Sequence, residues 1–121
     1  MANLTEGIYP AEFIISESRG TRSRDAAVLA TGNNLDAGTV LGKITASGKY
    51  AEHDPAAVDG TENAVAILYA PTDATLADAS CVVVSRDAEV DGNDLVWITG
   101  IIAGDKTDGI ASLAGVGIIV R

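Results

Sequence analysis

The sequence predicts a mainly β domain with short strands and one short helix near the C-terminus. Three observations lead to this fold class. The apolar runs are short, clusters of Gly, Pro, Asn and Asp separate them, and no long amphipathic helices alternate with them. The chain has 121 residues, of which 47% are apolar, so it fits one domain that buries a core of its own.

The first 25 residues differ from the rest of the chain. Gly7, Pro10 and Gly20 divide this segment into pieces that are too short for a helix or a long strand. We therefore expect residues 1–25 to form a flexible arm, and residues 26–121 to form the β-rich domain.

One apolar run inside this arm has two interpretations. Phe13, Ile14 and Ile15 are hydrophobic and partly β-branched, which favours an extended conformation. Such a run can add a strand to the sheet edge of a partner protein. It can equally form the first strand of the domain itself, and the sequence leaves both alternatives open.

After the arm, apolar runs and turn clusters alternate to the end of the chain. The runs at 63–69 and 80–86 are continuously apolar, which is typical of strands that are buried on both faces. Residues 47–48 make a tight reversal between two strands. The strands are expected at residues 26–30, 39–46, 49–51, 63–69, 80–86, 95–98 and 117–120.

One helix is expected near the C-terminus. Thr107 is a suitable N-cap, the helix would run to about residue 114, and Gly115 would end it in a left-handed conformation. Gly109 weakens this prediction, because glycine inside a helix costs about 1 kcal/mol relative to alanine.

Charge and composition exclude several classes of partner. The chain has 17 acidic and 8 basic residues, a formal charge of −9, which disfavours binding to nucleic acid. No apolar stretch approaches the roughly 20 residues that span a bilayer, so we expect no membrane association. Cys81 has no second cysteine to pair with and lies in the run Cys81-Val82-Val83-Val84. We interpret it as a small buried hydrophobe of a soluble protein made in the cytosol.

No catalytic, metal or cofactor site is expected. His53 is the single histidine, and because no second histidine could complete a zinc site we interpret it as a solvated loop residue. The acidic stretches 91–94 and 105–109 lack the pattern of a calcium loop and are interpreted as turns. Trp97 is expected to anchor the core, with an interface role as the alternative.

Four segments in succession carry a resemblance to a known family. They are YPAEFIISESRGTRSRD, NLDAGTVLGKITASGKY, AILYAPTDATLADASCVVVSRDAEV and LVWITGI. Their order in a chain of this length resembles the bacteriophage head decoration proteins typified by lambda protein D. The resemblance extends from Tyr9 to Arg121.

The resemblance implies a structural protein of the virion rather than an enzyme. It implies a β-clip-like fold and homotrimers that bind the outer surface of the expanded head and stabilise it against internal DNA pressure. The partner would be the major capsid protein, met in the host cytoplasm during assembly. The N-terminal arm would contact it, and the residues expected to bind are Tyr9, Pro10, Phe13, Ile14 and Ile15.

The main alternative is a nucleotide hydrolase or a ligand-binding module on a β-clip-like fold. A hydrolase would need basic side chains for phosphate, and Arg22, Arg24 and Arg86 are the candidates. A carbohydrate-binding module is disfavoured because aromatic residues, which stack on sugars, make up only 4% of the chain.

Overall fold

The computed structural model describes residues 13–17 and 23–121. Within them the chain is mainly β with one short helix near the C-terminus, as the sequence predicted. In chain order the elements are β1 (Ile14–Glu17), β2 (Arg24–Leu29), β3 (Asn33–Leu35), β4 (Val40–Lys43), β5 (Tyr50–Glu52), β6 (Ala66–Leu68), β7 (Thr72–Ala74), β8 (Ala79–Val84), β9 (Ala88–Val90), the 3-10 turn η1 (Gly92–Asp94), α1 (Ala103–Gly115) and β10 (Ile118–Val120).

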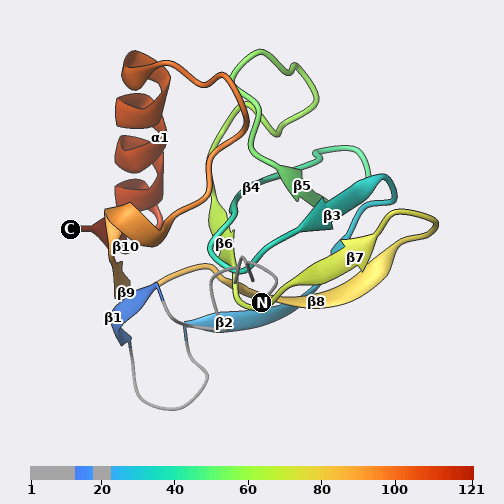
Figure 1. Cartoon of the computed structure of the whole chain (residues 1–121), viewed down its shortest axis with the longest axis horizontal. Helices are drawn as coiled ribbons and strands as arrows, with labels where there is room; N and C mark the ends of the chain where they lie inside the picture. The colour runs from blue at the N-terminus through green and yellow to red at the C-terminus, as the bar shows by residue number, and fades with distance from the viewer. Residues whose placement is uncertain (1–12, 18–22) are drawn as a thin grey trace, which may run out of the picture.

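The strands form three groups. A small closed barrel has the strand order β2-β5-β4-β6-β8, a separate sheet has the order β1-β9-β10, and β3 pairs with β7 as a two-stranded ribbon. In Figure 1, α1 stands beside the barrel, with β10, β9 and β1 below it. The longest pairing joins β2 and β8, which run antiparallel from Arg24↔Val84 to Leu29↔Ala79.

Strands β4 and β6 are buried on both faces, and β8 is so only at Val83 and Val84, because Val82 is 40% exposed. Successive side chains of a strand point to opposite faces of the sheet. Leu41, Leu68 and Val83 accordingly belong to one core cluster, which includes Leu29 and Cys81. Their neighbours on the other face belong to a second cluster, which packs under α1 and the β1-β9-β10 sheet. The members contributed by β4, β6 and β8 are Val40, Ile67 and Val84. This double burial explains why the corresponding sequence runs are continuously apolar.

The helix begins earlier than the sequence indicated. It starts at Ala103, after Ile102, whose side chain makes no capping hydrogen bond. Thr107, the expected cap, lies inside the helix, where its Oγ1 donates a hydrogen bond of 3.1 Å to the carbonyl oxygen of Ala103. The left-handed residue is Gly117, at φ 91°, whereas Gly115 is the last helical residue. Residues 105–109 lie inside this helix, so the prediction of a turn there was wrong.

Short polar strands escaped the sequence prediction. β3 (Asn-Asn-Leu), β7 (Thr-Asp-Ala) and β9 (Ala-Glu-Val) have three residues each and no continuous apolar run. The strand expected at 95–98 is reduced to a single bridge, in which Val96 pairs with Thr39. In the described part of the chain, no helix is long and apolar enough to cross a membrane.

Candidate functional site

The residues expected to contact the capsid differ in their burial, and two of them lie outside the described part of the chain. Tyr9 and Pro10 lie outside the described residues. Phe13 has an exposed fraction of 0% and belongs to the cluster under α1, and Ile14 is half-buried against that cluster. Ile15 is 54% exposed. The surface of the domain thus presents Ile15, while Phe13 serves the core.

Strand β1 is part of the domain. It pairs antiparallel with β9, with Ile14 opposite Val90, and the register shifts between Ile14 and Ser16. The amide of Asp91 donates a hydrogen bond of 2.8 Å to the carbonyl oxygen of Phe13. Of the two interpretations of the apolar run, the structure therefore has the strand of the domain itself. Binding of this run to a capsid stays a prediction.

Strand pairing also bears on the predicted boundary at residue 25 between a flexible arm and the β-rich domain. Within residues 1–25, the described part includes β1 and the first two residues of β2, Arg24 and Asp25. These residues belong to sheets of the domain. Residues 1–12 and 18–22 lie outside the described part, and a separate arm at the N-terminus stays a prediction.

β1 lies at one edge of its sheet. A row of polar and apolar side chains runs from it across the neighbouring strands. Ser16, Glu89 and Ile119 are in register across β1, β9 and β10. The Glu89 carboxylate accepts hydrogen bonds from Arg121 Nε at 2.9 Å and from Ser16 Oγ at 3.2 Å. These two bonds, chiefly the one from Arg121, hold the pKa of Glu89 below its usual range. Ile119 is partly exposed beside them.

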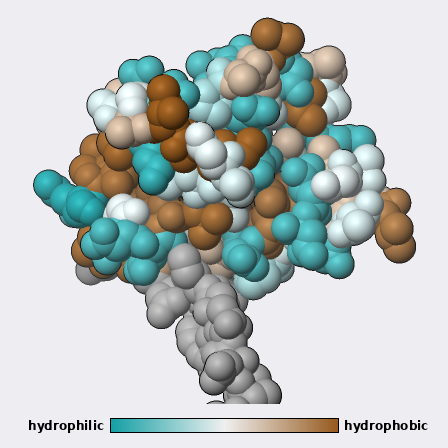
Figure 2. Space-filling view, turned by 45° about the horizontal axis from the view of Figure 1, so that its top comes forward, coloured by the Kyte–Doolittle hydropathy of each residue, from teal (hydrophilic) through white to brown (hydrophobic). Residues whose placement is uncertain are grey.

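Other exposed apolar residues are spread over several elements, and Val28 and Val82 are diagonal neighbours on one face of the β2-β8 pair. Figure 2 shows polar and apolar residues mixed on the face in view. Val58 and Leu76 stand in polar loops and are almost fully exposed. Their positions in polar segments could have indicated this exposure from the sequence. Scattered exposed aliphatic residues are ordinary on protein surfaces, so they do not by themselves mark a binding site.

His53 is buried, so the prediction of a solvated loop histidine was wrong. Its exposed fraction is 3%. Nδ1 lies 2.8 Å from the carbonyl oxygen of Thr61, and the ring meets that of Trp97 edge to face, with centroids 6.1 Å apart. Trp97 itself is partly buried and packs against the cluster under α1, which agrees with its expected place at the core. The sequence missed the burial because Trp97 and α1 are remote from His53 along the chain.

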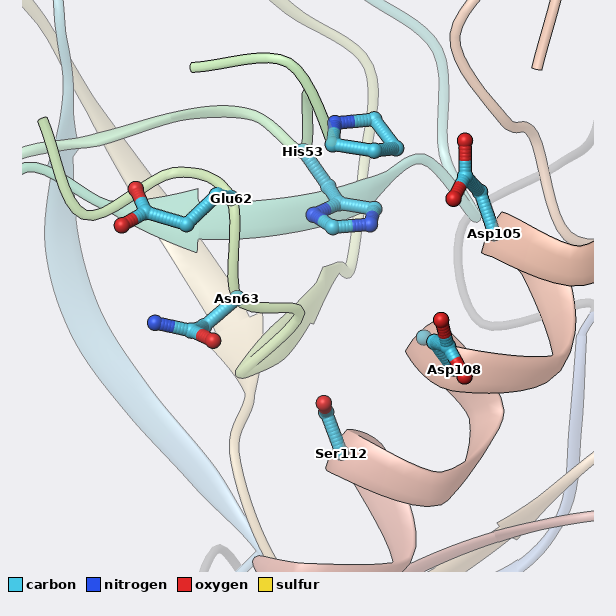
Figure 3. A pocket seen from close by; sticks show the side chains of 8 residues that line it. His53, Glu62, Asn63, Asp105, Asp108 and Ser112 are labelled. Atoms are coloured by element: carbon cyan, nitrogen blue, oxygen red, sulfur yellow. The ribbon is translucent and has the colours of Figure 1, made fainter. Parts of the chain in front are cut away.

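His53 lies in the wall of a crevice of about 280 Å³ between α1 and the loop around residues 53–63. Asp105, Asp108 and Ser112 of α1 form the opposite wall, as Figure 3 shows. Glu62 also lines the crevice, and its Oε1 accepts a hydrogen bond of 2.7 Å from the amide of Gly60.

The side chains considered for catalysis are engaged in other contacts. Arg86 Nη2 lies 2.5 Å from Asp25 Oδ2, and the guanidinium of Arg24 lies 4.3 Å from the centre of the Tyr69 ring. Arg22 lies outside the described residues. Burial raises the pKa of the Cys81 thiol, which lowers its reactivity.

Carboxylates, His53 and Cys81 are the candidate metal ligands in residues 13–17 and 23–121. Among them, no group of three or more His, Cys, Asp or Glu side chains is placed to hold a metal ion. The crevice at His53 is therefore lined by polar groups that do not converge on a single point.

Comparison with known proteins gives one family. A search of curated proteins found no match. The family described as bacteriophage lambda head decoration protein D matches residues 3–118, almost the whole chain. Its members are structural capsid proteins and not a known enzyme family. With a match of this length on a mainly β fold, the chain belongs to the bacteriophage lambda head decoration protein D family, which indicates a role in capsid decoration.

Proposed function

We propose that this protein binds as a homotrimer to the outer surface of the expanded phage head and stabilises the shell against the pressure of packaged DNA. The observation that carries the proposal is the family match over residues 3–118. The chemistry of the described surface agrees with a structural role, because Arg86 pairs with Asp25 and Arg24 packs on the Tyr69 ring, and these are two of the three arginines considered for phosphate binding.

The proposed mechanism combines many modest contacts. A trimer presents each contact three times, so binding one subunit raises the effective concentration of the other two at their sites. Residues 1–12 and the edge of β1 are the proposed attachment elements. An extended segment of the capsid protein added there would gain main-chain hydrogen bonds, with Ile15 supplying exposed apolar surface.

The test is co-sedimentation of the purified protein with expanded, undecorated heads, with unexpanded heads as the control. We expect saturable binding to expanded heads alone, with the number of bound chains at saturation a multiple of three. Absence of binding to heads of the phage that encodes the chain would refute the decoration role. Release of DNA from filled heads on mild heating, with and without the protein, tests the stabilisation against internal pressure.

The arm is tested with a truncation that spares the core. Deletion of residues 2–12 should leave a folded protein that binds heads more weakly, because Phe13 and β1 are retained. The matched control is Val58→Ser, which changes an exposed apolar residue in the loop far along the chain. Undiminished binding by the truncated protein would rule out the arm as an attachment element.

A further inference from the structure

The crevice between α1 and the loop around residues 53–63 contains a buried nitrogen without a partner. Nε2 of His53 is buried and has no hydrogen-bond partner among the described residues. It faces α1, since it lies 3.6 Å from the position that a Cβ at Gly109 would take. In Figure 3 the ring stands between the loop and the helix residues of the crevice.

The other ring nitrogen fixes the chemistry of Nε2. Nδ1 of His53 lies 2.8 Å from the carbonyl oxygen of Thr61, and a carbonyl oxygen only accepts hydrogen bonds. Nδ1 must therefore carry the proton. In the neutral ring, Nε2 then presents a lone pair to the crevice, so it is complementary to a hydrogen-bond donor.

The helix wall adds negative charge. Asp105, Asp108 and Ser112 recur at a spacing that puts them on one face of α1, the face of the crevice. Glu62 contributes a third carboxylate from the loop, and the lining includes no Lys or Arg. The lining thus carries three carboxylates and no lysine or arginine side chain to neutralise them.

Glycine at position 109 keeps this wall open. A Cβ there would lie 2.7 Å from Cζ3 and 3.0 Å from Cη2 of Trp97, and it would approach His53 Nε2. Trp97 can therefore approach α1 this closely, next to the histidine, only because residue 109 has no side chain. The glycine that weakens the helix has a packing reason in this crevice.

From these observations we infer that the crevice binds an organic cation with N–H donors, an ammonium or guanidinium group, between His53 Nε2 and the carboxylates of Asp105 and Asp108. A bare metal ion needs ligands within about 2–2.6 Å of one point. No such group exists among the described residues, whereas a polyatomic cation spans separated acceptors. A crevice of about 280 Å³ has room for a lysine or arginine side-chain head or a small free amine.

This inference goes beyond the decoration role and does not depend on it, because its test uses the isolated full-length protein. The 15N-labelled protein is titrated at low ionic strength with methylguanidinium and with n-butylammonium. The readouts are the 15N shift of His53 Nε2 and the amide shifts of residues 105–112. Saturable changes confined to the crevice are expected.

Two matched controls define specificity. Tetramethylammonium carries the same charge without N–H donors and should give no saturable change at Nε2. Asp108→Asn should weaken binding roughly fivefold, the effect of one lost charged partner at an exposed position. Asp36→Asn removes the same charge from an exposed position away from the crevice and should leave binding unchanged.

Further arms identify the source of the cation. Blocked arginine and lysine amides represent a side chain on a polypeptide, and 1,4-diaminobutane represents a free amine; saturable binding of either supports the inference. The inference is overturned if no N–H cation perturbs Nε2 saturably, or if tetramethylammonium acts equally. It is also overturned if Zn²⁺ alone binds there.

Discussion

Replacing Phe13 by alanine tests whether the N-terminal apolar run belongs to the core of the domain. Phe13 has an exposed fraction of 0% and packs in the cluster that contains Val90, Leu113 and Ile118. Truncation of a buried phenylalanine to alanine costs about 3–5 kcal/mol, from lost burial and the cavity left behind. A domain of this size has a total stability of about 5–15 kcal/mol, so the substitution should remove roughly a fifth of it or more.

The assay is chemical denaturation followed by circular dichroism, at one fixed protein concentration because association of chains would shift the apparent stability. The matched control is Ile15→Ala, two residues away and 54% exposed. It should change the free energy of unfolding by no more than about 0.5 kcal/mol. Equal denaturation midpoints for wild type and Phe13→Ala would refute the placement of Phe13. The separate arm would then extend beyond residue 12.

Three further predictions follow from the described contacts. Gly42→Ala should destabilise the fold by about 1–3 kcal/mol in the same assay, because its Cβ would lie 2.4 Å from Thr61 Cα; wild-type stability would contradict that packing. The hydrogen bonds from Arg86 and then Ser85 lower the pKa of Asp25, so its contribution is present above the unfolded-state pKa and is lost as the pH falls through the folded-state pKa. Asp25→Asn should therefore reduce the acid-induced loss of stability in a pH series of melts, and an unchanged pH profile would count against the ion pair. Cys81, buried and with a raised pKa, should react with iodoacetamide far more slowly in the native than in the denatured protein, as mass spectrometry would measure; equal rates would contradict its burial.

The sequence predicted those strands whose burial is visible within the strand itself. β6 lies in a continuous apolar run because alternate side chains enter two different clusters, and Val83 and Val84 at the end of β8 do the same. β3 and β7 escaped prediction because their three-residue segments are stabilised by pairing with each other, as Asn33↔Ala74 shows, and not by apolar content. Pairing between segments so far apart in the chain leaves no local pattern.

The candidate sites show the same limit. The run at Phe13 was read as extended, but its partner strand β9 follows some seventy residues later, so the sequence could not decide between domain and arm. The start of α1 was misplaced because Ile102 caps no amide with its side chain, while Thr107 has the residue type of a cap inside the helix. His53 was misjudged because its loop is polar and the groups that bury it come from α1 and Trp97.

The position of β1 links the core to the proposed attachment of the protein. Phe13, at the start of β1, is buried with Leu113 of α1 and Ile118 of β10, while β1 itself lies at the edge of the sheet. A strand held by the core keeps its edge in a fixed place. Addition of a capsid segment there would therefore cost less conformational entropy than addition to a mobile strand, because β1 is already ordered. The edge is also coupled to α1 through the same cluster. Attachment at β1 should therefore stabilise α1 more than the barrel interior, whose cluster around Leu29 and Val83 contains none of these residues.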